Sequence, residues 1–455
     1  MSVRRVDRSP ERMMRLVYLV AIYLLAPLAW LALVWRGLRD PSYRAGLTQR
    51  FGFGPASPAP SIWVHAVSVG EVQAAASLVQ ALRARFPEIP LTLTTVTPTG
   101  AGRARALFGD TVDVRYVPYD LPGSVGRFFA RVQPRVAVIL ETELWPNLYR
   151  GCGRRGIPLV LASARISPRS VGRYRMLASL FRETLSHGIV IAAQGEGDAE
   201  RFRAIGANPA KTHVVGNIKF DLALPADIRE RGAQWREAHA ATGRFLWVAG
   251  STHEGEEAAT LDAQRALEAA GIPNLLVIAP RHPARFDAVA GMSASRGVRA
   301  VRRSAGGSAA PDTQVLLLDT LGELIGWYAA ADAAFVGGSL VPVGGHNLLE
   351  PAALAVAAIT GPQVFNAQEI ADALVAEGAA EKVQDAAGLS DALLRLARDP
   401  AERARRGALG QALVERNRGT LQRLMALLEP LIAGPSSPKA ATEQARSPEP
   451  PSTNR

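Results

Sequence analysis

The chain has very little cysteine: Cys152 is the only one among its 455 residues. A single thiol cannot form a disulfide within the chain, and it cannot supply a zinc site by itself. The fold therefore does not depend on an oxidising compartment, and the cysteine content is typical of a protein from a reducing one. We interpret Cys152 as a small surface or helix residue.

Aromatic residues are also scarce, at 6 %, and the 52 Lys and Arg residues are dispersed along the chain rather than gathered in runs. Nucleic-acid-binding proteins usually concentrate their positive charge in clusters with interleaved aromatic residues. The formal charge of +11 therefore favours acidic lipid headgroups or phosphorylated small molecules as partners. We predict no nucleic-acid partner.

Several motifs that identify enzyme classes are missing. The sequence has no phosphate-binding G-x-x-x-x-G-K-[ST] loop, no G-x-S-x-G nucleophile elbow and no pair of C-x-x-C motifs. His253-Glu254 lacks the second histidine that a metalloprotease needs four residues after the first. No cluster of histidines and carboxylates has metal-ligand spacing, so we predict no metal. Any chemistry must rely on a carboxylate base together with cationic groups or helix ends.

One long apolar run is present near the N-terminus. Residues 16–35 carry no charge, and as a helix they would be ~30 Å long, the thickness of a bilayer core. No small-x-small cleavage site follows the run, which favours a retained membrane anchor over a signal peptide. Arginines flank both ends, so the sequence does not decide the orientation, or whether the helix spans the membrane or lies in its surface. We predict an anchor over residues 1–40.

From Ile62 onward, short strand-like runs alternate with amphipathic helical stretches. This alternation predicts an α/β fold with parallel sheets covered by helices on both faces. The runs are too many for one sheet, and the pattern is interrupted between residues 221 and 243. We therefore predict two doubly wound, Rossmann-like domains that face a cleft, over residues 41–221 and 222–433. Residues 434–455 are rich in proline and serine and are predicted to be a disordered tail.

Glu71 is a candidate functional residue in the first half. It follows the predicted strand 62–67 and lies in the first turn of the next helix. The helix dipole and the free N–H groups there should favour its ionised form. An ionised carboxylate at such a position can act as a general base, or it can cap the helix together with Ser68.

Two further candidates lie later in the same half. Glu141 and Glu143 follow the predicted strand 136–140. Because they are two residues apart after a strand, we expect only one of them to enter the cleft, and either can also be an ordinary helix-start acid. Lys219 stands near the end of the half, where it could neutralise a phosphate or carboxylate, or remain a solvated surface residue.

In the second half, polar and glycine-rich loops follow the predicted strands, where doubly wound sheets bind ligands. The segment GSTHEGE at 250–256 leaves backbone N–H groups open to an anion. Arg281 offers a planar fork for a phosphate or carboxylate. The segment GGHNLLEP at 344–351 suits close approach to a nucleotide phosphate, with Glu350 placed to accept ribose hydroxyls. A glycine-rich turn without a ligand is the alternative.

Nine short strings follow one another along the chain: HAVSVGE, TPTG, ETELWPN, ASARIS, GNIKFD, GSTHEGEE, PRHP, DTLGEL and GGHNLLEP. Each is modestly specific alone. Together, and in this order over roughly residues 12–430, they resemble the Kdo transferases, the 3-deoxy-D-manno-octulosonic acid transferases of lipopolysaccharide assembly. The departures from the family pattern are peripheral: an N-terminal extension of about a dozen residues and the proline-rich tail.

The resemblance implies a GT-B fold with an N-terminal membrane anchor. It implies an inverting transfer of Kdo from CMP-Kdo, the donor substrate, to the lipid A precursor lipid IVA. The transfer would occur at the cytoplasmic face of the bacterial inner membrane, with no cofactor and no obligatory metal. Another membrane-associated GT-B transferase that uses a different nucleotide sugar is the alternative.

The resemblance also implies roles for individual residues. Glu71 would be the general base, and Glu141 and Lys219 would stabilise the transition state. The implied CMP-binding residues are Pro280, Arg281, Leu321, Gly322, Glu323, Asn347, Leu348, Leu349 and Glu350. The sequence does not say how many Kdo residues are added.

Overall fold

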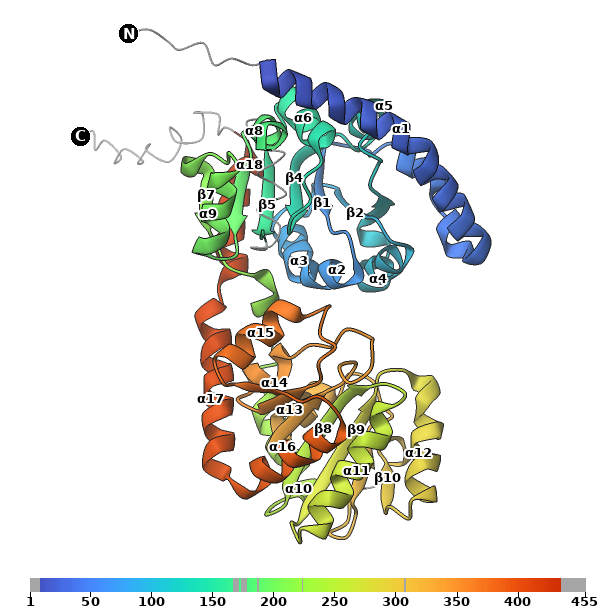
Figure 1. Cartoon of the computed structure of the whole chain (residues 1–455), viewed down its shortest axis with the longest axis vertical. Helices are drawn as coiled ribbons and strands as arrows, with labels where there is room; N and C mark the ends of the chain where they lie inside the picture. Colours follow the sequence, from blue (N-terminus) through green and yellow to red (C-terminus); the bar gives the residue numbers. More distant parts are fainter. Residues whose placement is uncertain are drawn as a thin grey trace, which may run out of the picture. The chain divides into compact units, whose positions relative to one another are not determined.

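The computed structural model of the chain describes residues 9–166, 172, 178–185, 188–222, 224–306 and 308–434. The chain folds into two compact units, and each contains a seven-stranded parallel sheet (Figure 1). Unit 1 comprises Met1–Lys219 and Gly419–Arg455, and unit 2 comprises Phe220–Arg418. The predicted tail, apart from Gly434, and the first eight residues of the predicted anchor lie outside the described residues. So does Ser167, the last residue of the ASARIS string.

The sheet of unit 1 has the strand order β3-β2-β1-β4-β5-β6-β7. Its strands are β1 (Ser61–His65), β2 (Leu91–Thr95), β3 (Asp113–Tyr116), β4 (Pro134–Leu140), β5 (Leu159–Ala164), β6 (Val190–Ala193) and β7 (Thr212–Val214). Its described α-helices after the N-terminal apolar run are α2 (Val69–Ala74), α3 (Ala76–Arg85), α4 (Pro98–Phe108), α5 (Pro122–Val132), α6 (Pro146–Arg154), α8 (Ala178–Leu185), α9 (Glu196–Ala204) and α18 (Thr420–Ala433). The strand–helix alternation predicted from the sequence is confirmed.

Local sequence sets where the helices of unit 1 begin. Proline occupies the first position of α4, α5 and α6, where its missing N–H is not needed and its fixed backbone angle suits a helix. Cys152 lies buried in α6. The central strands are buried on both faces, which explains their nearly continuous apolar sequence. Ile62 and Val64 pack on one face of the sheet, and Trp63 packs on the other, as the twofold period of a strand requires.

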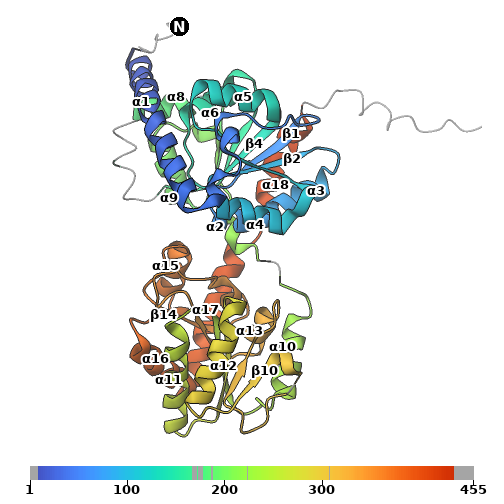
Figure 2. The ribbon, with the colours of Figure 1, turned by 90° about the vertical axis from the view of Figure 1, so that its right-hand side faces the viewer.

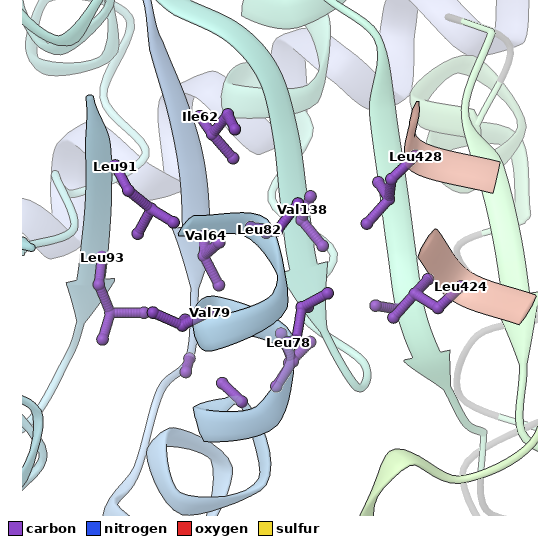
Figure 3. Close-up of a cluster of buried hydrophobic side chains, with 14 of the residues drawn as sticks. Ile62, Val64, Leu78, Val79, Leu82, Leu91, Leu93, Val138, Leu424 and Leu428 are labelled. Carbon is purple, nitrogen blue, oxygen red and sulfur yellow. The ribbon is translucent and has the colours of Figure 1, made fainter. Parts of the chain in front are cut away.

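Helix α18 belongs to unit 1, although it is the last described element of the chain. Figure 3 shows its Leu424 and Leu428 on the side of β4 and α3, in the same buried cluster as the side chains of β1. Unit 2 ends at Arg418, so the predicted domain 222–433 is corrected at its C-terminal end. An amphipathic helix shows in its sequence that it needs an apolar partner, but not which of two similar sheets provides it.

The sheet of unit 2 has the order β10-β11-β9-β8-β12-β13-β14. Its strands are β8 (Phe245–Thr252), β9 (Asn274–Pro280), β10 (Ala300–Arg302), β11 (Val315–Leu317), β12 (Ala333–Val336), β13 (Ala357–Thr360) and β14 (Ala380–Lys382). Its helices are α10 (Ile228–Ala238), α11 (Glu256–Ala269), α12 (Phe286–Ser295), α13 (Leu324–Ala330), α14 (Leu349–Ala353), α15 (Gln368–Ala376), α16 (Ala386–Arg398) and α17 (Pro400–Asn417). Buried apolar clusters lie on both faces of this sheet as well, so each unit is doubly wound.

Helix α1 (Ser9–Arg39) contains the long apolar run and packs against α8 of unit 1 (Figures 1 and 2). Among the described residues it is the one helix long and apolar enough to cross a membrane, by length and composition. Its exposed side chains are mostly large and apolar, and they include Leu16, Leu24, Leu28, Leu31 and Leu38. The helical structure expected for this segment is therefore confirmed.

Candidate active site

Several of the predicted site residues, among them Glu71, Glu141 and Glu350, lie in or directly after loops where the strand order of a sheet reverses. In unit 1, β1 is flanked by β2 on one side and by β4 on the other, so the chain changes direction between β1 and β4. In unit 2, the same change occurs between β8 and β12. Doubly wound sheets bind ligands beyond the carboxyl ends of the strands at this switch point. The loops after β1, β4, β8 and β12 are therefore the expected ligand-binding loops.

Glu71 lies in the first turn of α2, directly after β1. Ser68 is the N-cap residue, and its Oγ accepts a hydrogen bond from the Glu71 N–H at 3.4 Å. The Glu71 carboxylate accepts from the Val67 N–H at 2.8 Å and from the Ser68 hydroxyl at 3.3 Å. The cap expected for this position thus forms, and it holds the carboxylate in one place at the switch point.

The ionisation of Glu71 differs from the expectation. The pKa of Glu71 is raised to about 7: burial is the largest cause, the hydrogen bond from Val67 opposes it, and the nearby charges of Glu141 and Glu143 add to it. The expectation that the helix start would favour the ionised form is therefore wrong in its net direction, because burial outweighs the capping interactions. A carboxylate with a pKa near 7 can take up a proton at neutral pH, as a general base must.

The TPTG segment (residues 97–100) follows β2 and begins helix α4, which packs against α2, the helix that carries Glu71. Thr97 caps α4 by accepting a hydrogen bond from the Gly100 N–H at 3.0 Å. A Cβ atom on Gly100 would lie 2.5 Å from Thr95 Oγ1 and 3.5 Å from the Ser68 carbonyl carbon. A side chain at residue 100 would collide with the Thr95 hydroxyl, so glycine lets α4 begin directly beside the end of β2.

Glu141 and Lys219 form an ion pair at the carboxyl edge of the same sheet. The Lys219 Nζ lies 2.7 Å from Glu141 Oε1, and about a quarter of each side chain is exposed (25 % and 24 %). Glu141 has a left-handed backbone (φ 56°), as has Ser163 at the end of the neighbouring β5 (φ 50°). The Ser163 Oγ accepts from the Ile218 N–H at 3.1 Å, which fixes the residue before Lys219. Non-glycine residues in this conformation are strained and occur preferentially at functional sites.

Glu143 lies near enough to Glu71 for its charge to raise the pKa of Glu71. Its carboxylate accepts from Trp145 Nε1 at 2.8 Å, and its carbonyl oxygen accepts from the Tyr149 hydroxyl at 2.6 Å. Burial raises the pKa of Glu143; the Trp145 hydrogen bond lowers it, and the charge of Glu141 raises it further. The charges of both loop carboxylates raise the pKa of Glu71, so both lie near it; that only one of them enters the cleft stays a prediction. The left-handed turn at Glu141 ends the strand geometry on which that expectation depended.

In unit 2, the glycine-rich loop after β12 is fixed by one buried carboxylate that sequence reasoning did not single out. Glu256, in the first turn of α11, is completely buried. It accepts hydrogen bonds from the backbone N–H groups of His253, Gly338, Ser339 and Leu340 at 2.7–2.9 Å. The only signal in the sequence is an acidic residue at the start of a helix. Acidic residues are common at helix starts, so this signal does not single out Glu256.

Three histidines surround Arg281 at the switch point of unit 2. The Nε2 atoms of His253 and His346 lie 2.8 Å apart and their rings stack, while the His282 ring lies edge-on to His253. One ring of the stacked pair donates and the other accepts, so the two facing nitrogens share one proton. The pKa of His346 is lowered to about 4, first by burial and then by the positive charges of His253, Arg281 and His282. Sequence reasoning did not assign His253 or His346 to the site.

The predicted CMP-binding residues fall into two groups. Arg281 acts electrostatically on Glu350, whose pKa is raised by burial and lowered by the Asn347 hydrogen bond and by Arg281. The Asn347 amide donates to Glu350 Oε1 at 3.2 Å. Pro280, Leu348 and Leu349 are buried, so they could reach a ligand only through their backbone. The structure thus brings the strings PRHP and GGHNLLEP together in one place.

The second group, Leu321 to Glu323, lies after β11 and before α13. Leu321 is 77 % exposed, and Gly322 has a left-handed backbone (φ 85°). The Glu323 carboxylate is held by Arg303 at 3.0 and 3.1 Å and by the Thr320 hydroxyl. Burial raises the pKa of Glu323, but these hydrogen bonds outweigh it and leave the pKa lowered. The side chain of Glu323 is therefore bound to Arg303. It does not join the Arg281 group, by which we mean Arg281 with His253, His282, His346, Asn347 and Glu350.

Comparison with known proteins identifies the family. Residues 45–222 match the family model of 3-deoxy-D-manno-octulosonic-acid transferase (kdotransferase). The chain is 41 % identical over 429 residues to the 3-deoxy-D-manno-octulosonic acid transferase of Haemophilus influenzae, covering 92 % of this chain and 99 % of that protein. The chain belongs to the Kdo transferase family. It is 41 % identical over 431 residues to the transferase of Bordetella pertussis, covering 91 % of this chain and 98 % of that protein.

Solved structures agree on the fold of this Kdo transferase family member. MurG of Acinetobacter baumannii matches with a TM-score of 0.53 at 14 % identity, over 82 % of this chain and 99 % of that one. The C-terminal CMP-Kdo binding domain of WaaA from Acinetobacter baumannii is 35 % identical, with a TM-score of 0.41, over 42 % of this chain and 100 % of that one. The GT-B fold expected from the resemblance is confirmed, and the family makes the chain a glycosyltransferase.

Proposed function

We propose that this enzyme transfers Kdo, with inversion, from CMP-Kdo to lipid IVA at the cytoplasmic face of the inner membrane. The observation that carries the proposal is the Glu71 carboxylate, which is fixed at the switch point of unit 1 with a pKa of about 7. Membership of the Kdo transferase family supports the sugar, and the Arg281 group in unit 2 has the chemistry that a CMP phosphate requires.

In the proposed reaction, Glu71 accepts the proton of the attacking acceptor hydroxyl. The hydroxyl oxygen forms a bond to the anomeric carbon of Kdo as the bond from that carbon to the phosphate oxygen breaks, and the electron pair leaves with CMP. Positive charge must stabilise the departing phosphate and the sugar carboxylate. Lys219 supplies such a charge in unit 1, and Glu141 orients it through the 2.7 Å ion pair.

Donor binding is assigned to unit 2. Arg281 can form two parallel hydrogen bonds to the CMP phosphate, and Glu350 can accept from ribose hydroxyls. The stacked pair of His253 and His346 lies near Arg281, and a bound phosphate would offset the positive charges that lower the pKa of His346. We propose that Pro280, Leu348 and Leu349 contribute backbone groups, that Leu321 to Glu323 border the nucleotide, and that no metal cofactor takes part.

The membrane is the proposed location of the acceptor. The exposed face of α1 carries a continuous set of large apolar side chains, with Arg36 and Arg39 in its last turn. Apolar area of this kind inserts into lipid, and basic residues at its end suit anionic headgroups. We therefore propose that α1 holds the enzyme on the inner membrane, where a lipid acceptor is found.

The function is tested by a transfer assay with purified protein, CMP-Kdo and tetra-acylated lipid IVA, read by mass spectrometry. A product heavier by one or more Kdo units is expected, also when a chelator is present and the donor is supplied preformed. Product made from a UDP-sugar but not from CMP-Kdo would favour a different GT-B transferase. Loss of transfer with chelator, restored by Mg²⁺, would contradict the metal-free proposal.

The pH dependence of transfer follows from Glu71. The base acts only when it is deprotonated, so we expect kcat/KM to fall about tenfold per pH unit below a pKa of about 7 and to level off above it. Glu143→Gln removes a negative charge that raises this pKa, so its acid limb should lie at lower pH. The measurement is kcat/KM from pH 5.5 to 8.5 for both proteins. A rate independent of pH over this range would exclude Glu71 as the titrating base.

A further inference from the structure

Helix α1 does more than present an apolar face, because it is bonded to the interior of unit 1. The Tyr18 hydroxyl donates a hydrogen bond to Asp120 Oδ2 at 2.7 Å, across 102 residues of sequence. Further along α1, the Trp30 ring packs edge-on against Phe51 at 5.5 Å, and Phe51 packs in the same way against Tyr119. Two separate contacts of α1 therefore lead to the adjacent residues Tyr119 and Asp120.

Asp120, the acceptor of the Tyr18 hydrogen bond, is a buried residue of unit 1. It is 1 % exposed, and its carboxylate accepts from the backbone N–H groups of Asn147 at 2.9 Å and Leu148 at 2.8 Å. The Asn147 amide in turn donates to the Asp120 carbonyl oxygen at 2.6 Å. Asn147 and Leu148 form the first turn of α6, so Asp120 caps this helix from a distant part of the chain.

The first turn of α6 is hydrogen-bonded to the loop that connects β4 to α6. This loop carries Glu141 and Glu143, and we call it the acidic loop. Trp145 immediately precedes α6, and its indole N–H donates to the Glu143 carboxylate. Tyr149, one turn into α6, donates to the Glu143 carbonyl oxygen. Glu141 and Glu143 both act on Glu71. A continuous series of contacts therefore runs from α1 through Asp120 and the start of α6 to the loop that faces the base.

We propose that Tyr18 and Asp120 are positioning residues, which make the geometry of the acidic loop depend on how α1 is seated on unit 1. The proposal rests on the proposed function, because it gives that loop its role in transfer. Helix α1 then has a second role, since it completes the support of Glu143 besides carrying the apolar surface. An enzyme whose α1 is displaced should keep its fold and its donor site but lose the correct placement of Glu143 relative to Glu71.

Tyr18→Phe tests this proposal because it removes one oxygen atom and leaves the ring in place. Tyr23→Phe is the matched control, since Tyr23 lies on the same helix and is 56 % exposed. Full-length wild type and both variants are compared in phospholipid vesicles by hydrogen–deuterium exchange. We expect amide exchange at residues 141–150 to be about fivefold faster in Tyr18→Phe, the change that loss of one hydrogen bond produces. Tyr23→Phe should match the wild type.

The transfer assay provides the second measurement. In Tyr18→Phe, the acid limb of kcat/KM should shift and kcat should fall several-fold, while the KM for CMP-Kdo stays unchanged; a purely structural contact would not move the limb. Asp120→Asn should show larger changes in the same directions. Exchange and pH profile that are the same in Tyr18→Phe and Tyr23→Phe would overturn the proposal. If the wild type itself makes no product, the proposed function fails, and the exchange data alone decide whether α1 supports the loop.

Discussion

Glu71→Gln is expected to lose almost all transfer activity while its affinity for CMP stays at the wild-type value. General bases contribute ~10²–10⁴-fold to enzymatic rates. Glutamine has nearly the same shape and can still accept the hydrogen bond that the Val67 N–H gives to Glu71. The loop should therefore keep its structure, and only the ability to take up a proton is lost. The measurements are kcat with CMP-Kdo and lipid IVA, and the Kd of CMP by calorimetry.

Arg281→Ala is the reciprocal control for this prediction. It removes the cation of the proposed donor site in unit 2 and leaves Glu71 intact, so CMP binding should weaken strongly. Glu71→Gln should therefore change kcat, and Arg281→Ala should change the Kd of CMP. A Glu71→Gln enzyme that retains more than about one-tenth of the wild-type kcat would contradict the assignment of Glu71 as the base, since the expected loss is at least ~10²-fold.

Lys219→Met should give the second-largest loss of transfer. Removing one group that stabilises charge in a transition state typically lowers kcat by ~10²–10³-fold. Glu141→Gln should lower kcat in the same direction, because Lys219 then lacks the partner that orients it. Since the two residues act as one unit, the double variant should be little worse than Lys219→Met alone. The measurement is a double-mutant cycle on kcat and kcat/KM.

Lys211 offers a matched control for the charge of Lys219. It lies in the same unit, and its Nζ lies 3.4 Å from the carbonyl oxygen of Gly188 near the surface. Lys211→Met therefore changes net charge as Lys219→Met does, without touching the Glu141 pair. Equal losses of kcat in the two lysine variants would show that the effect is one of overall charge. Fully additive losses in the Lys219 and Glu141 variants would show that the ion pair does not act as a unit in the reaction.

Much of the fold follows from the sequence because it depends on local patterns and one topological rule. Strand and helix periodicity predicts doubly wound units, and ligands of such units bind at the carboxyl edge of the sheet. This rule places Glu71, Glu141, Arg281 and Glu350 at the right edges without any distance being known. Their roles in the reaction come from the resemblance, because each residue type alone also suits a helix cap or a surface position.

The remaining features depend on contacts between distant segments. The pKa of Glu71 reflects its burial and two carboxylates about 70 residues further along the chain. Glu143 follows a left-handed turn at Glu141, a conformation that sequence rarely predicts for glutamate. His253 and His346 meet across 93 residues. None of these contacts has a periodic or motif-like signal from which it could have been inferred.

The position of α18 has a consequence for how the protein is made. A chain emerges from the ribosome N-terminus first, and domains generally fold as they appear. Here the core of unit 1 includes Leu424 and Leu428, which are synthesised after every residue of unit 2. Unit 2 can therefore be complete while unit 1 still has an open apolar face beside α3. Unit 1, which carries Glu71, therefore completes its apolar core only after α18 has been synthesised.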